Sequence, residues 1–434
     1  MSRRLLYYVL PLPFVLLIFA GAFSSLSLGD EPPAAPASAE PDSPEADSPE
    51  AKADDPAKPE VKEPAPAEEP APAVEPVKPA VEKRPLDPVA AKAAKAAYEA
   101  KLSEWRDLLI AMRKFYEDHH LASTDAEAAP HREKWEAAMK QGKKILDELV
   151  PLAKTAYQAA PNTDKQITNF LNAMLIDRAG HDDYETAWEL ADLLLEQGGE
   201  SPAAYNPAGL AAYTTNHYEA ADLLFTQAKQ QDVKSEERDK LWPTINYHHG
   251  EWAREEKLRA EEAEKNDLPR VKMSTTAGDM VLELFEDQAP QTVANFISLV
   301  EDGFYDGLEF HRVLPAFMMQ GGDPDSDGTG GPGYFIYDEC GREDARMHFR
   351  GVISMAHSGN PNTGGSQFFI MFSQAEWLDR KHTVFGRVIE GLDVLSKIQR
   401  IDPEDEKAQP KPDAITKATV LRKRDHEYKP TKVQ

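Results

Sequence analysis

The sequence predicts a multidomain protein in which an N-terminal all-α helical-repeat region precedes a mainly-β barrel capped by two helices. Between about Val89 and Glu264, apolar residues recur at three- and four-residue steps, which is the spacing of amphipathic helices. From Arg270 onward, short apolar runs alternate with glycine-rich turns, a pattern typical of strands. At 434 residues the chain is too long for one ordinary domain, so we expect a boundary where the pattern changes.

The composition excludes several function classes. The formal net charge is −26, and binding to a nucleic-acid backbone needs a basic surface, so we expect no nucleic-acid partner. The single cysteine, Cys340, excludes an internal disulfide and the usual cysteine-rich zinc site. We therefore expect no metal in this protein.

The first 28 residues have the pattern of an export segment. Arg3 and Arg4 precede an almost wholly apolar stretch over residues 5–23. A cleaved signal peptide fits this pattern, and so does an uncleaved membrane anchor, because about 19 apolar residues just span a bilayer. Both alternatives predict an exported protein, periplasmic or otherwise extracytoplasmic, with possible membrane anchoring through residues 5–23.

Residues 29–88 are predicted to form a disordered linker. The segment consists mainly of Pro, Ala, Glu, Asp, Ser and Lys, and it contains no aromatic residue. Such a composition buries too little apolar surface to offset the entropy of an ordered chain. We expect an extended spacer between the N-terminal segment and the folded regions.

Residues 89–267 are predicted to be a helical, tetratricopeptide-like domain. The sequence YETA at Tyr184 recurs as YEAA at Tyr218, an offset of 34 residues, which is the period of tetratricopeptide helix pairs. An ordinary helical bundle with a chance repeat remains the alternative. Helix pairs of this kind often bind proteins, so a protein partner on the repeats is possible. The charged stretch Glu251–Asp267 is expected to form a solvated cap or connector.

Residues 270–424 are predicted to form the barrel, followed by a polar tail over residues 425–434. Each element follows from a local signal, such as a turn between apolar runs or a proline that begins a helix. The expected elements are two strands within Val271–Phe285, a helix from Pro290, a second helix over Val394–Gln399 and a closing strand over Ala414–Leu421.

The segment FHRVLPAFMMQGGDP, Phe310–Pro324, combines one arginine with large apolar side chains at strand-like spacing. In a regular strand, Met318 and Gln320 would lie on one face, and Phe317 and Met319 on the other. Arginine is rarely buried without a purpose, so an arginine beside an apolar wall indicates a binding site.

Three further motifs follow: DGTGGPGYF from Asp327, ISMAHSGNPNTGGSQFFIMF from Ile353 and EWLDRKHTVFG from Glu376. Together with FHRVLPAFMMQGGDP, they resemble the cyclophilins, a family of peptidyl-prolyl isomerases. The resemblance covers about Arg270–Arg424. It implies an eight-stranded antiparallel barrel with two capping helices, in agreement with the pattern described above.

The resemblance also implies the site, in which a donor and an apolar pocket act on a proline residue. The implied catalytic residues are Arg312, Phe317, Gln320 and His382. The implied substrate-binding residues are His311, Met318, Ala356, His357, Gln367, Phe369, Trp377 and Leu378.

The chemistry needs no nucleophile, metal or cofactor, because only rotation about the X–Pro bond is accelerated. Proline-containing polypeptides are the implied substrates, and Trp377 implies inhibition by ciclosporin. The alternative function is a proline-peptide-binding scaffold, in which the helical repeats recruit partners and little turnover occurs.

Two departures from the family pattern stand out. Ala316 replaces a common glycine, and the stretch CGREDARMHF, Cys340–Phe349, follows the pattern poorly, so its loop is unpredictable. Neither departure removes a group that the resemblance assigns to catalysis.

Overall fold

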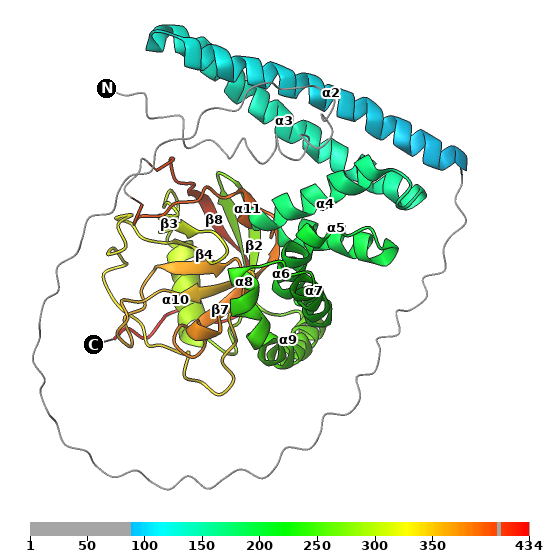
Figure 1. Ribbon diagram of the computed structural model, residues 1–434. Helices are drawn as coiled ribbons and strands as arrows, with labels where there is room; N and C mark the ends of the chain where they lie inside the picture. The colour runs from blue at the N-terminus through cyan, green and yellow to red at the C-terminus, as the bar shows by residue number, and fades with distance from the viewer. Residues whose placement is uncertain (1–87, 406–408, 434) are drawn as a thin grey trace, which may run out of the picture. The chain divides into compact units, whose positions relative to one another are not determined.

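The computed structural model describes residues 88–405 and 409–433. The predicted export segment, residues 1–28, and the predicted linker up to residue 87 lie outside these residues. Among the described residues, no helix is both long enough and apolar enough to cross a membrane. Element labels below are those of Figure 1, in which α2 is the first described helix.

The first part of the described chain is helical, as predicted, and its two longest helices, α2 and α3, run side by side (Figure 1). Thr124 caps α3, because its side chain accepts a hydrogen bond from the backbone N–H of Glu127. The helices are α2 (Pro88–Leu121), α3 (Asp125–Ala159), α4 (Lys165–Gly180), α5 (Tyr184–Gln197), α6 (Tyr205–Thr214), α7 (Tyr218–Gln230), α8 (Glu236–Leu241) and α9 (Ile245–Lys265), with short 3-10 turns at η1 (Pro202–Ala204) and η2 (Trp242–Thr244).

The 34-residue repeat corresponds to two packed helix pairs. Tyr184 begins α5, which packs against α4, and Tyr218 begins α7, which packs against α6. Both tyrosines are completely buried, so the aromatic positions of the repeat fill the space between helices. The assignment of these pairs to the tetratricopeptide class stays a prediction.

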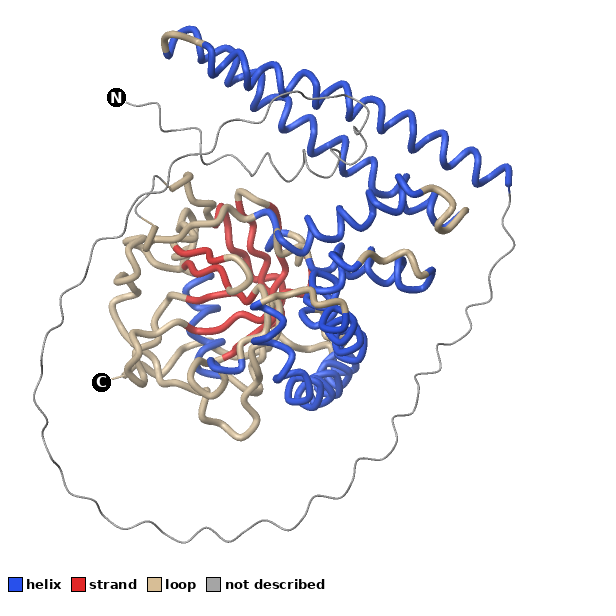
Figure 2. The backbone as a smooth tube through the Cα atoms, in the orientation of Figure 1, coloured by secondary structure: helices blue, strands red, loops and turns tan. Residues whose placement is uncertain are grey.

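The second part forms one curled antiparallel sheet of eight strands, drawn in red in Figure 2. Along the sheet the order is β3-β4-β6-β5-β7-β2-β1-β8. An isolated bridge between Glu309 and Ala414 links the chain before β3 to the chain before β8, at the two ends of the sheet. The strands are β1 (Arg270–Thr275), β2 (Gly278–Leu284), β3 (Arg312–Leu314), β4 (Met318–Gly321), β5 (Val352–Met355), β6 (Phe368–Met371), β7 (Val384–Glu390) and β8 (Ile415–Arg422).

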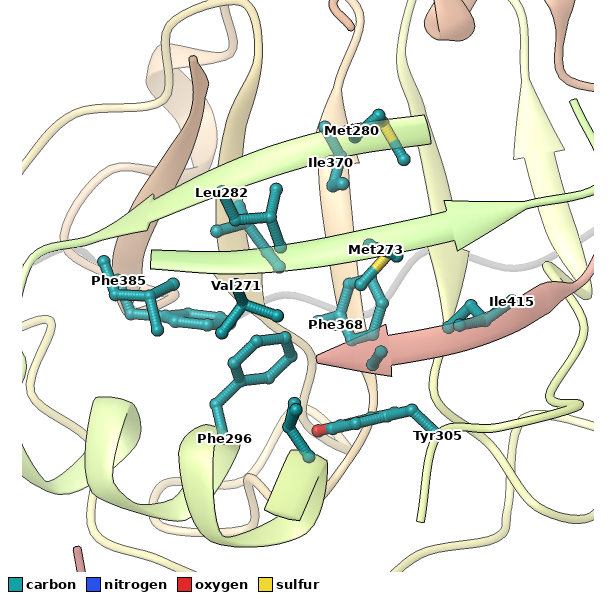
Figure 3. Close-up of a cluster of buried hydrophobic side chains, with 14 of the residues drawn as sticks. Val271, Met273, Met280, Leu282, Phe296, Tyr305, Phe368, Ile370, Phe385 and Ile415 are labelled. Carbon is teal, nitrogen blue, oxygen red and sulfur yellow. The ribbon is translucent and has the colours of Figure 1, made fainter. Parts of the chain in front are cut away.

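The core of this sheet lies between its inner face and α10 (Pro290–Glu301), the helix predicted from Pro290. Phe296 of α10 points toward the strands in Figure 3, with its ring 5.3 Å from that of Phe385 and 5.8 Å from that of Phe368. The second predicted helix is shorter than expected. It is α11 (Val394–Lys397), because the backbone of Ile398 is already extended.

Helix α9 is not the solvated connector that its charged sequence indicates. Glu255 on α9 is buried, and both of its carboxylate oxygens accept hydrogen bonds at 2.7 Å from Arg346, in the loop before β5. Burial alone would raise the pKa of Glu255, but the hydrogen bonds and charge of Arg346 outweigh it and hold that pKa at about 2. Glu262 pairs with Arg346 and, at 3.0 Å, with Arg387 on β7. The charges of α9 therefore dock it against the sheet.

Replacing Arg346 with alanine is expected to lower the free energy of unfolding by about 3–5 kcal/mol, because Glu255 loses a buried partner. Urea unfolding followed by circular dichroism measures this change. The matched control is Arg113→Ala, which breaks an exposed pair with Glu117 on α2 and should change stability by less than about 1 kcal/mol. Equal losses in the two variants would contradict the buried contact.

Candidate active site

The hairpin of β3 and β4 carries the first part of the candidate site. Arg312 pairs with Gln320 across the hairpin, and Leu314 pairs with Met318. Met319 points into the barrel core, whereas Met318 belongs to a second apolar cluster outside it. The alternation predicted for Met318 and Met319 is thus confirmed, and it places the candidate pocket on the outer face of the sheet.

Phe317 does not share a face with Met319, so that part of the sequence prediction is wrong. The residue lies in the turn before β4 begins, where strand alternation does not apply. Its ring packs against the same outer cluster as Met318. Phe317 and Met318, adjacent in sequence, therefore both line the pocket.

The guanidinium of Arg312 stands beside this apolar surface. Its central carbon lies 6.0 Å from the centroid of the Phe317 ring. Among the described residues, Arg312 makes no ion pair, although it is half-buried. A guanidinium always carries charge and several N–H donors, so this group is available to a bound molecule.

Two amide side chains fix the polar edge of the site. Gln367 donates from Nε2 to the carbonyl oxygens of Gly328 at 3.0 Å and Gly330 at 2.9 Å. Its Oε1 must then accept, and Gln320 donates to it at 2.9 Å. The loop 328–330 thereby orients both amides next to Arg312.

The floor of the pocket is apolar. Met318 and Phe369 are at least 95% buried, and Phe317, Ala356 and Leu378 pack against the same cluster. Trp377 is half-exposed, and its ring lies 6.0 Å from that of Phe317. The structure thus brings the predicted wall residues together around one apolar surface.

Two stacked histidines close the other side. The rings of His357 and His382 lie 4.0 Å apart, and His382 meets Phe369 edge to face at 5.4 Å. Nδ1 of His382 lies 3.0 Å from the carbonyl oxygen of Met355 and must carry a hydrogen, because a carbonyl only accepts. Burial lowers the pKa of His382 to about 4. His382 is therefore a neutral wall residue near pH 7, not an acid.

His311 lies apart from these contacts. The side chain is buried, and within residues 88–405 and 409–433 neither of its ring nitrogens has a hydrogen-bond partner. Burial lowers the pKa of His311, against the weaker opposing effect of Asp323. His311 is not part of the apolar cluster around Met318, and its role in substrate binding stays a prediction.

A buried support that the sequence did not predict lies behind Phe369. His348 stacks on the Phe369 ring at 5.9 Å, with 11° between the ring planes. Its Nδ1 lies 2.8 Å from Asp379 and its Nε2 lies 3.0 Å from the hydroxyl of Ser354. Ser354 is completely buried and cannot reach a substrate, so the series Asp379, His348 and Ser354 is not a nucleophilic triad. Asp379 was visible in the motif EWLDRKHTVFG, but nothing local indicated its partner.

No group of three or more His, Cys, Asp or Glu residues suited to hold a metal ion occurs in the described part of the chain. The groups gathered at the pocket are a free cationic donor, two oriented amides and an apolar floor. This combination suits binding and polarising a neutral, compact, partly apolar group.

Comparison with known proteins agrees with this chemistry. The family model described as cyclophilin type peptidyl-prolyl cis-trans isomerase matches residues 270–420. A peptidyl-prolyl cis-trans isomerase of Helicobacter pylori is 48% identical over 33% of this chain and 88% of its own length. The isomerase ppi1 of Schizosaccharomyces pombe is 40% identical over 36% of this chain and 100% of its own. A solved cyclophilin-type isomerase of Cryptosporidium parvum is 33% identical over 36% of this chain and 99% of that chain, with a TM-score of 0.32.

The depressed pKa of His382 is expected to make the folded protein less stable as pH falls. An unfolded histidine titrates near 6.5 and the folded one at about 4, so the unfolded state binds the proton first. Stability should therefore be lost progressively between about pH 6.5 and about pH 4. In His382→Asn, the thermal unfolding midpoint should fall less over this range than in the wild type. His249→Gln, at an exposed position on α9, serves as the control. Parallel pH curves for wild type and His382→Asn would contradict the expectation.

Proposed function

The chain belongs to the cyclophilin-type peptidyl-prolyl cis-trans isomerases, and from this premise we propose that Arg312 is the donor that accelerates X–Pro rotation. The observation that carries the proposal is the Arg312 guanidinium, unpaired among the described residues and adjacent to the Phe317 ring. Arg346 and Arg387, by contrast, pair with carboxylates of α9.

The barrier that the enzyme must lower comes from amide resonance. Delocalisation of the nitrogen lone pair gives the peptide C–N bond partial double-bond character and a barrier of about 18–20 kcal/mol. A donor directed at the prolyl nitrogen holds the lone pair on nitrogen as the bond twists. Arg312 supplies that donor, and its interaction is stronger in the twisted state than in either planar isomer, which is the requirement for catalysis.

The proline ring is proposed to sit on Met318 and Phe369, with Phe317 and Leu378 at its sides. These side chains already pack in one apolar cluster, which supports a shared contact surface for the ring. Excluding water there strengthens the hydrogen bond from Arg312. Gln320, which is oriented by Gln367, is proposed to contact the polar backbone beside the ring.

Ala356 and His357 are proposed to hold the substrate backbone while the other side of the X–Pro bond turns. The N–H of Ala356 donates to the carbonyl of Gln367 at 3.0 Å, so this backbone is fixed to the polar edge. The ring nitrogens of His357 are engaged by Lys381 and Gly359, which keeps its side chain away from a direct acid–base role. Substrate contacts at His357 are accordingly assigned to its backbone.

The setting of this activity is proposed from the sequence. Residues 1–28 would export the protein, and the linker would separate the isomerase from a membrane if residues 5–23 act as an anchor. The substrates are then X–Pro bonds in exported polypeptides. A protein partner on the helical repeats is proposed from the 34-residue period alone, because helix pairs of this kind often bind proteins.

Arg312→Ala is expected to lower kcat/KM for a proline-containing peptide by about 10²–10³-fold, the range seen when one preorganised donor is removed. Arg312→Lys keeps the charge but loses the fork of donors, so it should recover only part of the loss. A direct isomerisation assay and proline-limited refolding of a denatured protein measure both variants.

Arg342→Ala is the control for this prediction, because Arg342 lies exposed in the 340–349 loop, where it pairs with Asp344 and donates to the carbonyl of Asp287. Ciclosporin should inhibit the wild type, and Trp377→Ala should weaken that inhibition. Wild-type rates in Arg312→Ala would favour the alternative function, a proline-peptide-binding scaffold with little turnover.

Fractionation of cells that make the full chain is expected to recover it outside the cytoplasm. N-terminal sequencing of that material distinguishes a chain that begins near residue 29 from an anchored chain that keeps residues 5–23. Cross-linking before extraction reports whether the helical region holds a partner. Cytoplasmic recovery of a chain with its N-terminus intact would overturn the proposed setting.

A further inference from the structure

The two helix pairs of the 34-residue repeat are each joined by a turn with the same construction. Asp182 in the first turn and Asn216 in the second both adopt left-handed backbone conformations, with φ of 61° and 67°. Each side chain accepts a hydrogen bond from the tyrosine hydroxyl two residues later, Tyr184 at 3.0 Å and Tyr218 at 2.9 Å. The repeat therefore presents two equivalent oxygen atoms at one edge of the helical region.

Both oxygens contact the isomerase region. Oδ1 of Asp182 accepts a hydrogen bond from the backbone N–H of Ala316 at 2.9 Å. Oδ1 of Asn216 accepts one from the side-chain amide of Gln374 at 3.0 Å. Gln374 is almost completely buried, whereas Asn216 is partly exposed. The two repeated turns thus dock on the two segments that lead into Phe317 and Trp377.

The contact at Ala316 bears on the pocket because of its backbone conformation. Ala316 has a φ of 57°, a left-handed conformation that is unfavourable for a residue with a Cβ and easy for glycine. The hydrogen bond to Asp182 holds its N–H in that conformation. Phe317 and Met318, the pocket residues, follow directly, so the backbone of Ala316 sets their direction.

A second series of contacts links the Asp182 carboxylate to Phe317. Asp182 forms an ion pair with Arg400, and its side chain is only 3% exposed. The guanidinium of Arg400 lies 4.6 Å from the centre of the Phe372 ring. Phe372 donates its N–H to the carbonyl of Phe317 at 2.8 Å. Asp182 therefore reaches Phe317 both through Ala316 and through Arg400.

We propose that Asp182, in the helical region, is a positioning residue for the isomerase site. Its carboxylate holds Ala316 left-handed and so fixes Phe317 and Met318 where a proline ring can bind. Substrate affinity then depends on a residue more than a hundred positions away, in a different folded region. The inference rests on the proposed pocket, and it makes the helical region part of the enzyme's working structure.

The test uses the full chain and compares Asp182→Ala with Asp182→Asn. In Asp182→Ala, KM for a proline-containing peptide should rise about five- to tenfold with kcat little changed, because a binding wall loosens while Arg312 stays on β3. Asp182→Asn keeps an oxygen that accepts from Ala316, so most of the wild-type KM should return. Asp183→Ala is the matched control, since Asp183 lies in the same turn and pairs with Arg178 inside the helical region.

The double variant Asp182→Ala with Ala316→Gly separates positioning from general stability. Glycine adopts the left-handed conformation without help, so it should restore KM even though the ion pair with Arg400 is lost. A wild-type KM in Asp182→Ala would overturn the inference. A loss of activity that follows the fraction of unfolded protein, and that Ala316→Gly does not restore, would overturn it as well. Arg312→Ala, assayed in parallel, shows separately whether the proposed function itself holds.

Discussion

Charged side chains that leave water must find partners, and this constraint decides how α9 meets the sheet. Arg346 and Glu255 are both buried, and each would be strongly destabilising alone. Their bidentate contact, extended by Glu262 to Arg387, satisfies both charges in one geometry. A helix can shift along a purely apolar interface, but a shift here would break the bidentate ion pair. The ion pair therefore fixes the position of α9 along the sheet.

The fixed register carries over to the candidate pocket through packing. Phe349, three residues after Arg346, meets Trp252 of α9 edge to face at 5.1 Å. Phe349 belongs to the same apolar cluster as Met318 and Phe369. The apolar cluster of the candidate pocket is therefore continuous with the contact between α9 and the loop before β5. The loop that departs from the family pattern contains the arginine that makes this interface.

Sequence reasoning succeeded where the signal was local and failed where it was not. Motifs such as FHRVLPAFMMQGGDP predicted the sheet, and the period between Tyr184 and Tyr218 located the helix pairs. The contact of Glu255 with Arg346 spans 91 positions, and each residue alone has the pattern of a surface charge. Phe317 was assigned to the wrong face because a turn, invisible to alternation, precedes β4. The pattern of residues along the sequence contains no signal for contacts between distant residues or for the geometry of this turn.

The arginines of the barrel region show why Arg312 differs. Arg346, Arg350 and Arg400 all form ion pairs with carboxylates of the helical region, so their guanidinium groups are engaged within the folded protein. Arg312 lies beside the Phe317 ring with no such partner in the described part of the chain, which folding alone would not favour. A half-buried cation left unpaired is compatible with a stable fold only if its donors stay accessible to solvent or to a ligand. Arg387 is likewise paired with Glu262, so Arg312 differs from these four arginines in having no ion-pair partner among the described residues.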